Sequence, residues 1–113
     1  MTSDERQFLL TATWLFMRHG QRARALAVCE ALVEDNPRDG VAAIALAELL
    51  LDGTEAARAL DALHDADVPD SLAHVAAVLE TRALKMMGRS VESAARWRRY
   101  LESQKGAARQ WVA

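Results

Sequence analysis

Apolar residues recur along this chain every three or four positions, which is the spacing of one face of an α-helix. Glycine or proline separates most of these stretches, as is usual between helices. The pattern predicts six helices, over residues 4–18, 21–34, 41–51, 55–64, 72–87 and 90–103. We expect Gly106 to end this pattern, so that residues 105–113 form a tail with Trp111 on one further helical turn.

Three glycines divide the predicted helices into pairs. Gly20, Gly53 and Gly88 are 33 and 35 residues apart. This spacing is close to the period of about 34 residues in tetratricopeptide repeats. The residues before Gly20 follow the order of that repeat, with a small residue, Thr13, where the two helices of a pair approach. Ala25 is the small residue expected to face it.

The predicted architecture is therefore all-α. Three tandem tetratricopeptide-like helical hairpins form a short right-handed solenoid with a concave groove. One domain spans residues 1–113, with repeats at about 4–36, 37–69 and 70–104 and a tail at 105–113.

Several polar residues are predicted to cap helices. Thr2 and Glu5 have the spacing of a capping box for the first helix. Thr54 and Asp70 are expected to cap the fourth and fifth helices. Asn36 and Pro37 are expected to end the second helix and begin the third.

Composition supports helices and excludes several classes of protein. The chain holds 23 Ala and 15 Leu against eight Val and one Ile, so helix formers dominate. The net charge of −2 offers no general attraction to nucleic acid or anionic lipid. Cys29 is the only cysteine, which excludes an intramolecular disulfide and favours a reducing compartment. No apolar run is long enough to span a bilayer and the first residues do not resemble a secretory signal, so we expect a soluble cytosolic protein.

No residue pattern indicates catalysis. His19, His64 and His74 lie on different predicted elements, without the spacing of a metal site. Cys29 occupies a position that the repeat buries, which favours an inert core thiol over a nucleophile. The sequence therefore predicts no enzymatic activity, no cofactor and no metal.

The basic cluster near the end of the chain has a structural explanation. Trp97 and Tyr100 share one predicted helix face, whereas Arg96, Arg98 and Arg99 largely solvate the other. Together with the negative net charge, this arrangement argues against nucleic-acid binding.

The first helices of stacked pairs line the concave face of such an arc. The residues expected there, as contacts for a partner, are Leu10, Trp14, Met17, Arg18, Ile44, Glu48, Leu51, Val78, Arg82 and Met86, with Val75 and Lys85 on the same face. This set is mainly apolar, as a groove for an amphipathic partner helix is, and Trp14 is the expected dominant contact. The alternative is that several of these residues are ordinary core, or are covered by the segment around Trp111.

Both ends of the chain resemble a known family. Two groups of residues carry the resemblance: Phe8-Leu9-Leu10, Trp14-Leu15 and Gly20 near the start, and Gly88, Trp97 and Tyr100-Leu101-Glu102 near the other end. In these residues the chain resembles the small tetratricopeptide chaperones of bacterial type III secretion, the YscY (SctY) family. The resemblance covers residues 8–102. It implies a chaperone in the bacterial cytoplasm, and so a virulence-associated protein-transport function.

The resemblance also implies partners. The chaperone would bind a small exported apparatus component (YscX-like) through an amphipathic helix in the groove, forming a heterodimer that meets the export gate. Two alternatives stay open: a chaperone of the needle subunit (YscG-like), and a general tetratricopeptide scaffold that forms homo-oligomers through the same patch.

Overall fold

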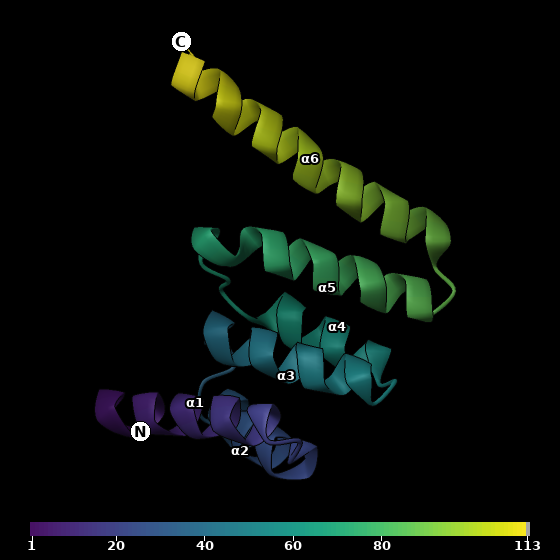
Figure 1. Cartoon of the computed structure of the whole chain (residues 1–113). Helices are drawn as coiled ribbons and strands as arrows, with labels where there is room; N and C mark the ends of the chain where they lie inside the picture. The colour runs from purple at the N-terminus through teal and green to yellow at the C-terminus, as the bar shows by residue number, and fades with distance from the viewer. Residues whose placement is uncertain (113) are drawn as a thin grey trace.

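The computed structural model describes residues 1–112, and the last residue of the expected tail, Ala113, lies outside them. Over the described residues the chain is all-α, as predicted (Figure 1). The elements, in chain order, are α1 (Ser3–Arg18), α2 (Arg22–Asp35), α3 (Gly40–Asp52), α4 (Ala56–Asp65), the short 3-10 helix η1 (Asp70–Leu72), α5 (Ala73–Met86) and α6 (Ser90–Val112).

The helices form three antiparallel pairs that follow one another along the molecule. Each helix packs against the next one in the chain, and α3 also contacts α5. Figure 1 shows the pairs α1–α2, α3–α4 and α5–α6 in succession from the N-terminal to the C-terminal end. The middle pair is therefore covered on both sides, and α3 supplies more buried residues than any other helix of the described chain.

The turn inside each pair has the same geometry, and the three turns are equally spaced along the chain. Gly20, Thr54 and Gly88 have positive φ angles of 70°, 62° and 76°. They are 34 residues apart, and we call this spacing the repeat interval. The following N–H donates in each case to a carbonyl of the preceding helix, at 2.8, 2.8 and 2.9 Å, which is a helix C-terminal motif that favours glycine. The expected cap role of Thr54 is wrong, because Thr54 takes the left-handed position and α4 starts only at Ala56.

The repeat interval also relates the small residues inside the pairs. Ala25, Ala59 and Ser93 are all buried where the second helix meets the first. Thr13 is 2% exposed and its hydroxyl donates to the carbonyl of Leu9. The predicted close approach of the helices at Thr13 and Ala25 agrees with this burial.

Two of the expected helix starts differ from the structure. Thr2 caps α1 as predicted, because its hydroxyl accepts the N–H of Glu5 at 3.1 Å. In contrast, α3 starts only at Gly40, beyond Pro37, and the carboxylate of Asp39 accepts the N–H of Ala42. Asp70 does not cap α5, since residues 70–72 form the 3-10 turn η1 before that helix.

The connection between α4 and α5 crosses the start of α3. The N–H of Asp67 donates to the carbonyl of Arg38 at 2.9 Å. A Cβ atom on Gly40 would overlap the backbone carbonyl of Asp67. Glycine is therefore required at the first residue of α3 so that the connection can pass.

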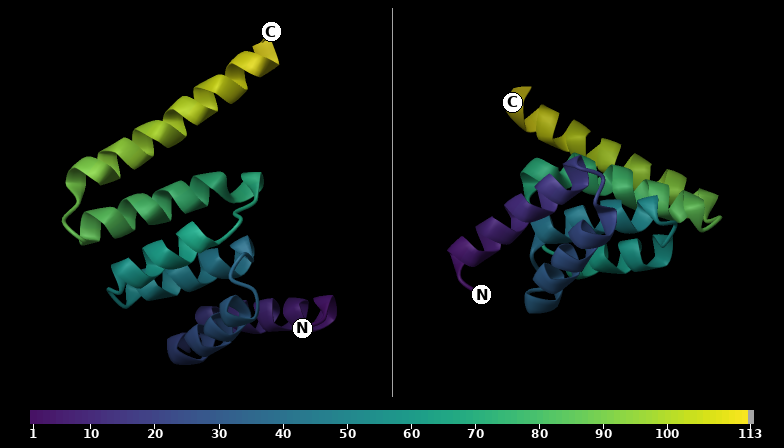
Figure 2. Two further views of the ribbon diagram at one scale, coloured as in Figure 1. Left: turned by 180° about the vertical axis from the view of Figure 1, so that it is seen from behind. Right: turned by 60° about the horizontal axis from the view of Figure 1, so that its bottom comes forward.

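The last helix is longer than expected. α6 continues through Gly106 to Val112, so Gly106 does not end the pattern. Nothing lies within 4 Å of the position that a Cβ atom would take at Gly106, and the neighbouring alanines favour helix. Figure 2 shows α6 extending past α5 and away from the other helices. Trp111 is 92% exposed, so the alternative in which its segment covers the inner face is wrong.

Candidate functional site

One side of the first helices stays exposed in all three pairs. Its residues recur at the repeat interval, and we call this set the first-helix face: Gln7, Trp14, Arg18, Val41, Glu48, Asp52, Val75, Arg82 and Met86. Trp14 is 54% exposed, and Val41, Val75 and Met86 are 37–41% exposed. Large apolar side chains this exposed are typical of contact surfaces when they gather on one side of a molecule.

The N-terminal part of this face contains a shallow hollow between α1 and α3. Its volume is about 380 Å³ and it is lined by Arg6, Gln7, Leu10, Thr11, Trp14 and Val41. The guanidinium carbon of Arg18 lies 5.1 Å from the centre of the Trp14 ring, a cation–π distance that orients the indole. The hollow thus offers apolar side chains together with a positioned aromatic ring.

Charges of both signs flank these apolar residues. Arg18 and Arg82 are positive, whereas Glu48 and Asp52 are negative. Arg82 Nη2 lies 3.4 Å from Asp52 Oδ1, and both side chains are about half exposed. Such a pair contributes little to stability, so its groups remain available to a partner.

Two residues expected on the accessible inner face lie in the core. Ile44 is 8% exposed and Leu51 is 1% exposed, because the following pair of helices covers this side of α3. Leu10 and Met17, one repeat earlier, are partly buried. The predicted partner-binding face therefore included too many residues, since Ile44 and Leu51 are buried between the second helix pair and the third.

The other expected contact residues are accessible. Trp14, Arg18, Glu48, Val78, Arg82 and Met86 are all exposed. Sequence reasoning missed Gln7, Val41 and Asp52. Val41 and Gln7 lie one and two repeat intervals before Val75, so the repeat in the sequence identifies both residues as part of the same face.

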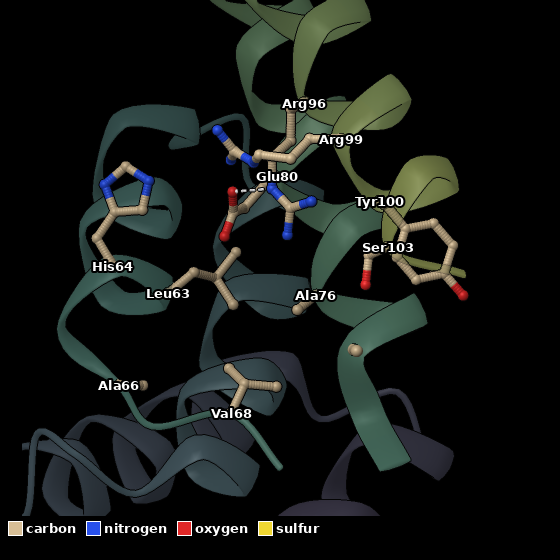
Figure 3. A pocket seen from close by; sticks show the side chains of 11 residues that line it. Leu63, His64, Ala66, Val68, Ala76, Glu80, Arg96, Arg99, Tyr100 and Ser103 are labelled. Atoms are coloured by element: carbon tan, nitrogen blue, oxygen red, sulfur yellow. Dashed lines mark hydrogen bonds and ion pairs between the residues drawn. The ribbon is translucent and has the colours of Figure 1, made fainter. Parts of the chain in front are cut away.

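A second, larger cavity lies on another side of the molecule. It measures about 470 Å³, and it is lined by residues of α4, α5, α6 and the connection between α4 and α5 (Figure 3). Leu63, Val68 and Ala76 contribute apolar surface, while the polar groups include His64, Arg99, Tyr100 and Ser103.

An ion pair forms part of the wall of this cavity. Arg96 Nε donates to Glu80 Oε2 at 2.6 Å, and the two side chains are 16% and 13% exposed. Figure 3 shows the Glu80 carboxylate facing the Arg96 guanidinium. A carboxylate held in this way is occupied by a structural partner, which differs from a general base that is free to accept a proton from substrate.

The three histidines lie apart, as their sequence positions indicated. His19 ends α1, His64 borders the second cavity, and His74 packs against the rings of Trp97 and Tyr100 at 6.0 and 5.6 Å. Within residues 1–112, no group of three metal-ligating side chains comes together.

The cysteine is part of the core. Cys29 is fully buried, and its Sγ lies 3.8 Å from Thr13 Oγ1. Burial raises the pKa of the Cys29 thiol, because a thiolate is poorly solvated there. The predicted buried position is confirmed, and this environment disfavours the thiolate.

Comparisons with protein-family models, with curated proteins and with solved structures found no match to this chain. Among the helices of the described chain, none is both long enough and apolar enough to cross a bilayer.

Proposed function

We propose that this protein binds an amphipathic helix of a partner polypeptide on its first-helix face. The observation that carries the proposal is the exposure of Trp14 beside the hollow of α1 and α3. Val41, Val75 and Met86 extend the apolar surface over the two following first helices. The apolar side of an amphipathic helix binds in grooves of this composition.

We also propose the finer fold and family. The hairpins form a tetratricopeptide-like solenoid whose concave groove contains the first-helix face, and the protein is a type III secretion chaperone of the YscY (SctY) kind. The regular recurrence of turns and small residues supports the solenoid. The resemblance at both ends of the sequence supports the family.

The mechanism in this proposal is holding, without chemistry. A small exported protein (YscX-like) with an exposed amphipathic helix is prone to aggregate in the bacterial cytoplasm. Covering that helix keeps it soluble until the complex reaches the export gate. Trp14 would act as the central anchor, since buried tryptophans dominate many interfaces, and the flanking charges of Arg18 and Asp52 would set the orientation of the helix.

Substitutions on the first-helix face test this proposal. Trp14→Glu and Val41→Glu should each weaken binding of the YscX-like client at least about tenfold, because each places a charge against an apolar surface. Isothermal titration calorimetry measures the affinity, and circular dichroism checks helical content. Val91→Glu is the matched control, since Val91 is 81% exposed on α6, away from this face.

The outcomes separate the alternatives. Unchanged affinity in both variants, with folding intact, removes the first-helix face from the mechanism. Binding of a needle subunit in place of the YscX-like client identifies the sister class of chaperone. Binding of neither client removes the secretion assignment.

A further inference from the structure

The array of helix pairs has an uncovered start. At positions related by the repeat interval, α3 and α5 bury side chains that α1 leaves exposed. Phe8 is 71% exposed and Leu15 is 43% exposed. Their equivalents are 0–5% exposed: Ala42, Leu49, Ala76 and Ala83. Phe8 and Leu15 therefore form a start face, which has the position of an internal junction but is covered by no other helix of the described residues.

The array also has an uncovered end. Val78 is 41% exposed and Trp97 is only partly buried, whereas Ile44 and Leu63, one repeat earlier, are 8% and 3% exposed. A hollow of about 430 Å³ marks this end face, and it is lined by Val78, Thr81, Arg82, Lys85 and Trp97. The repeat places the first helix of a following pair here.

Thr81, which lines this hollow, differs from its equivalent in the first pair. The hydroxyl oxygen of Thr81 is buried and has no hydrogen-bond partner, although buried polar atoms are almost always paired. The equivalent hydroxyl of Thr13 donates to the carbonyl of Leu9 and lies near the Cys29 thiol. The end face therefore includes a buried hydroxyl whose equivalent, that of Thr13, finds its partners within its own helix pair.

We infer that the start face of one copy docks on the end face of another, so that α1 of the second copy takes the place of the next first helix. This inference does not depend on the proposed chaperone function. Its basis is that α3 and α5 already make this kind of contact within the chain, and that α1 occupies their place in the repeat. Stacks of this kind bury their faces through nearest neighbours.

The repeat predicts which side chains meet at the junction between copies. Arg82 pairs with Asp52 across the junction of the second and third pairs. Met86 lies one repeat interval after Asp52. The position one interval after Arg82 falls in the second copy, where it corresponds to Trp14. Trp14 and Met86 are 54% and 41% exposed. Between copies, an apolar contact of the Trp14 indole with the Met86 thioether therefore takes the place of the ion pair that Arg82 and Asp52 form within the chain.

A second internal contact gives a complementary polar pair. Arg6 donates to Asp39 across the junction of the first and second pairs. His74 lies two repeat intervals after Arg6. The position two intervals after Asp39 falls in the second copy, where it corresponds to Glu5. The side chains of His74 and Glu5 are both exposed. Asp4 lies beside Glu5 in the first turn of α1, so this arrangement brings the acidic end of α1 to an imidazole.

This association leaves an open face at each end of every assembly. The start and end faces are different surfaces, so the contact is heterologous and does not close by two-fold symmetry. The assembly should therefore lengthen with concentration, without stopping at a dimer.

Sedimentation velocity of the pure protein over a series up to about 1 mM tests the inference, a range that detects even weak association. The average mass should rise steadily above the 12.4 kDa of one chain. Phe8→Glu and Val78→Glu should each abolish this rise, whereas Val91→Glu should leave it unchanged. Leu15→Glu and Lys85→Glu are second variants for the two faces, and circular dichroism confirms that each variant folds.

Mixing the two variants is the decisive measurement. Phe8→Glu retains a competent end face, and Val78→Glu retains a competent start face. An equimolar mixture should therefore form a one-to-one dimer and nothing larger.

Three results would overturn the inference: a wild-type monomer over the whole series, association that survives both substitutions, or no dimer in the mixture. If the wild type stays monomeric and Val78→Glu abolishes binding of the YscX-like client, the end face binds a client helix in place of a second copy. The client affinity of Val41→Glu reports on the proposed function separately, because Val41 is not among the contacts predicted between copies.

Discussion

Arg6 in α1 and Asp39 before α3 form a paired contact in which Arg6 Nε and Nη2 donate to the two carboxylate oxygens of Asp39, at 2.6 and 3.0 Å. The same carboxylate accepts the N–H of Ala42 and so caps α3. The hydrogen bond from Arg6 is the main reason why the pKa of Asp39 lies below its ordinary value. One side chain thus joins the first helix pair to the second.

Two substitutions at Asp39 separate its roles. Asn caps helices about as well as Asp, so Asp39→Asn loses mainly the charge-assisted contact with Arg6 and should lower the free energy of unfolding by about 1–2 kcal/mol. Asp39→Ala also loses the cap and should cost about 1 kcal/mol more. Urea denaturation at neutral pH measures both values, and equal losses would show that the cap contributes nothing.

The Asp39 contact also predicts a pH dependence. Because folding lowers the pKa of Asp39, its contribution is complete above the unfolded-state pKa and disappears as the pH falls through the lower folded-state value. The wild type should therefore lose its advantage over Asp39→Asn below about pH 4. Urea denaturation at a series of acidic pH values checks this, and a constant difference between the two proteins contradicts it.

Thr54 occupies a position that glycine fills in the other two turns. Its φ of 62° is unfavourable for a β-branched residue. Thr54→Gly should raise the free energy of unfolding by about 0.5–1 kcal/mol, because the left-handed strain exceeds the entropic cost of the added glycine. Thermal denaturation measures the change.

The reverse substitution is the control for Thr54. Gly20 has a φ of 70°, and nothing lies within 4 Å of its Cβ position. Gly20→Thr should therefore destabilise the protein by about 1–2 kcal/mol through backbone strain alone. Opposite effects at Gly20 and Thr54 support their equivalence in the repeat, and effects of the same sign contradict it.

Gly40 and Gly106 should respond oppositely to the same substitution. A Cβ atom on Gly40 meets the backbone of Asp67, so Gly40→Ala should cost about 1–3 kcal/mol. Gly106 lies inside α6 with open space around it, so Gly106→Ala should increase helix stability by about 0.5–1 kcal/mol. Urea denaturation reports the first change, and amide hydrogen exchange near residue 106 reports the second.

Ile44 provides a test of the corrected face. Because Ile44 is 8% exposed, Ile44→Asp should destabilise the fold by at least about 3 kcal/mol, through the lost apolar burial and the buried charge. Val41→Asp, one helical turn earlier on the exposed side of α3, should change stability by less than about 0.5 kcal/mol. A thermal shift of similar size for both variants would mean that α3 does not present these two faces.

Much of the local structure was predictable because local interactions determine it. The helix-forming composition, the cap at Thr2, the turns at Gly20 and Gly88 and the small residue at Ala25 all depend on neighbours close in the sequence. Thr54 was misassigned because the preceding residue, Gly53, offers a more obvious left-handed residue. In the structure the spacing of the repeat decides which residue takes the left-handed conformation. That residue is Thr54, which lies midway along the chain between Gly20 and Gly88.

By itself, the sequence determined that this chain folds into paired helices, because helix propensity and apolar spacing act over short distances. Only the tertiary structure decided which side of each first helix remains open. Ile44 and Leu51 are buried because another pair packs over them, whereas Val78, at the position equivalent to Ile44, is exposed because no further pair within residues 1–112 packs over it. Burial in a repeating fold depends on neighbouring units, and no single unit's sequence contains that information.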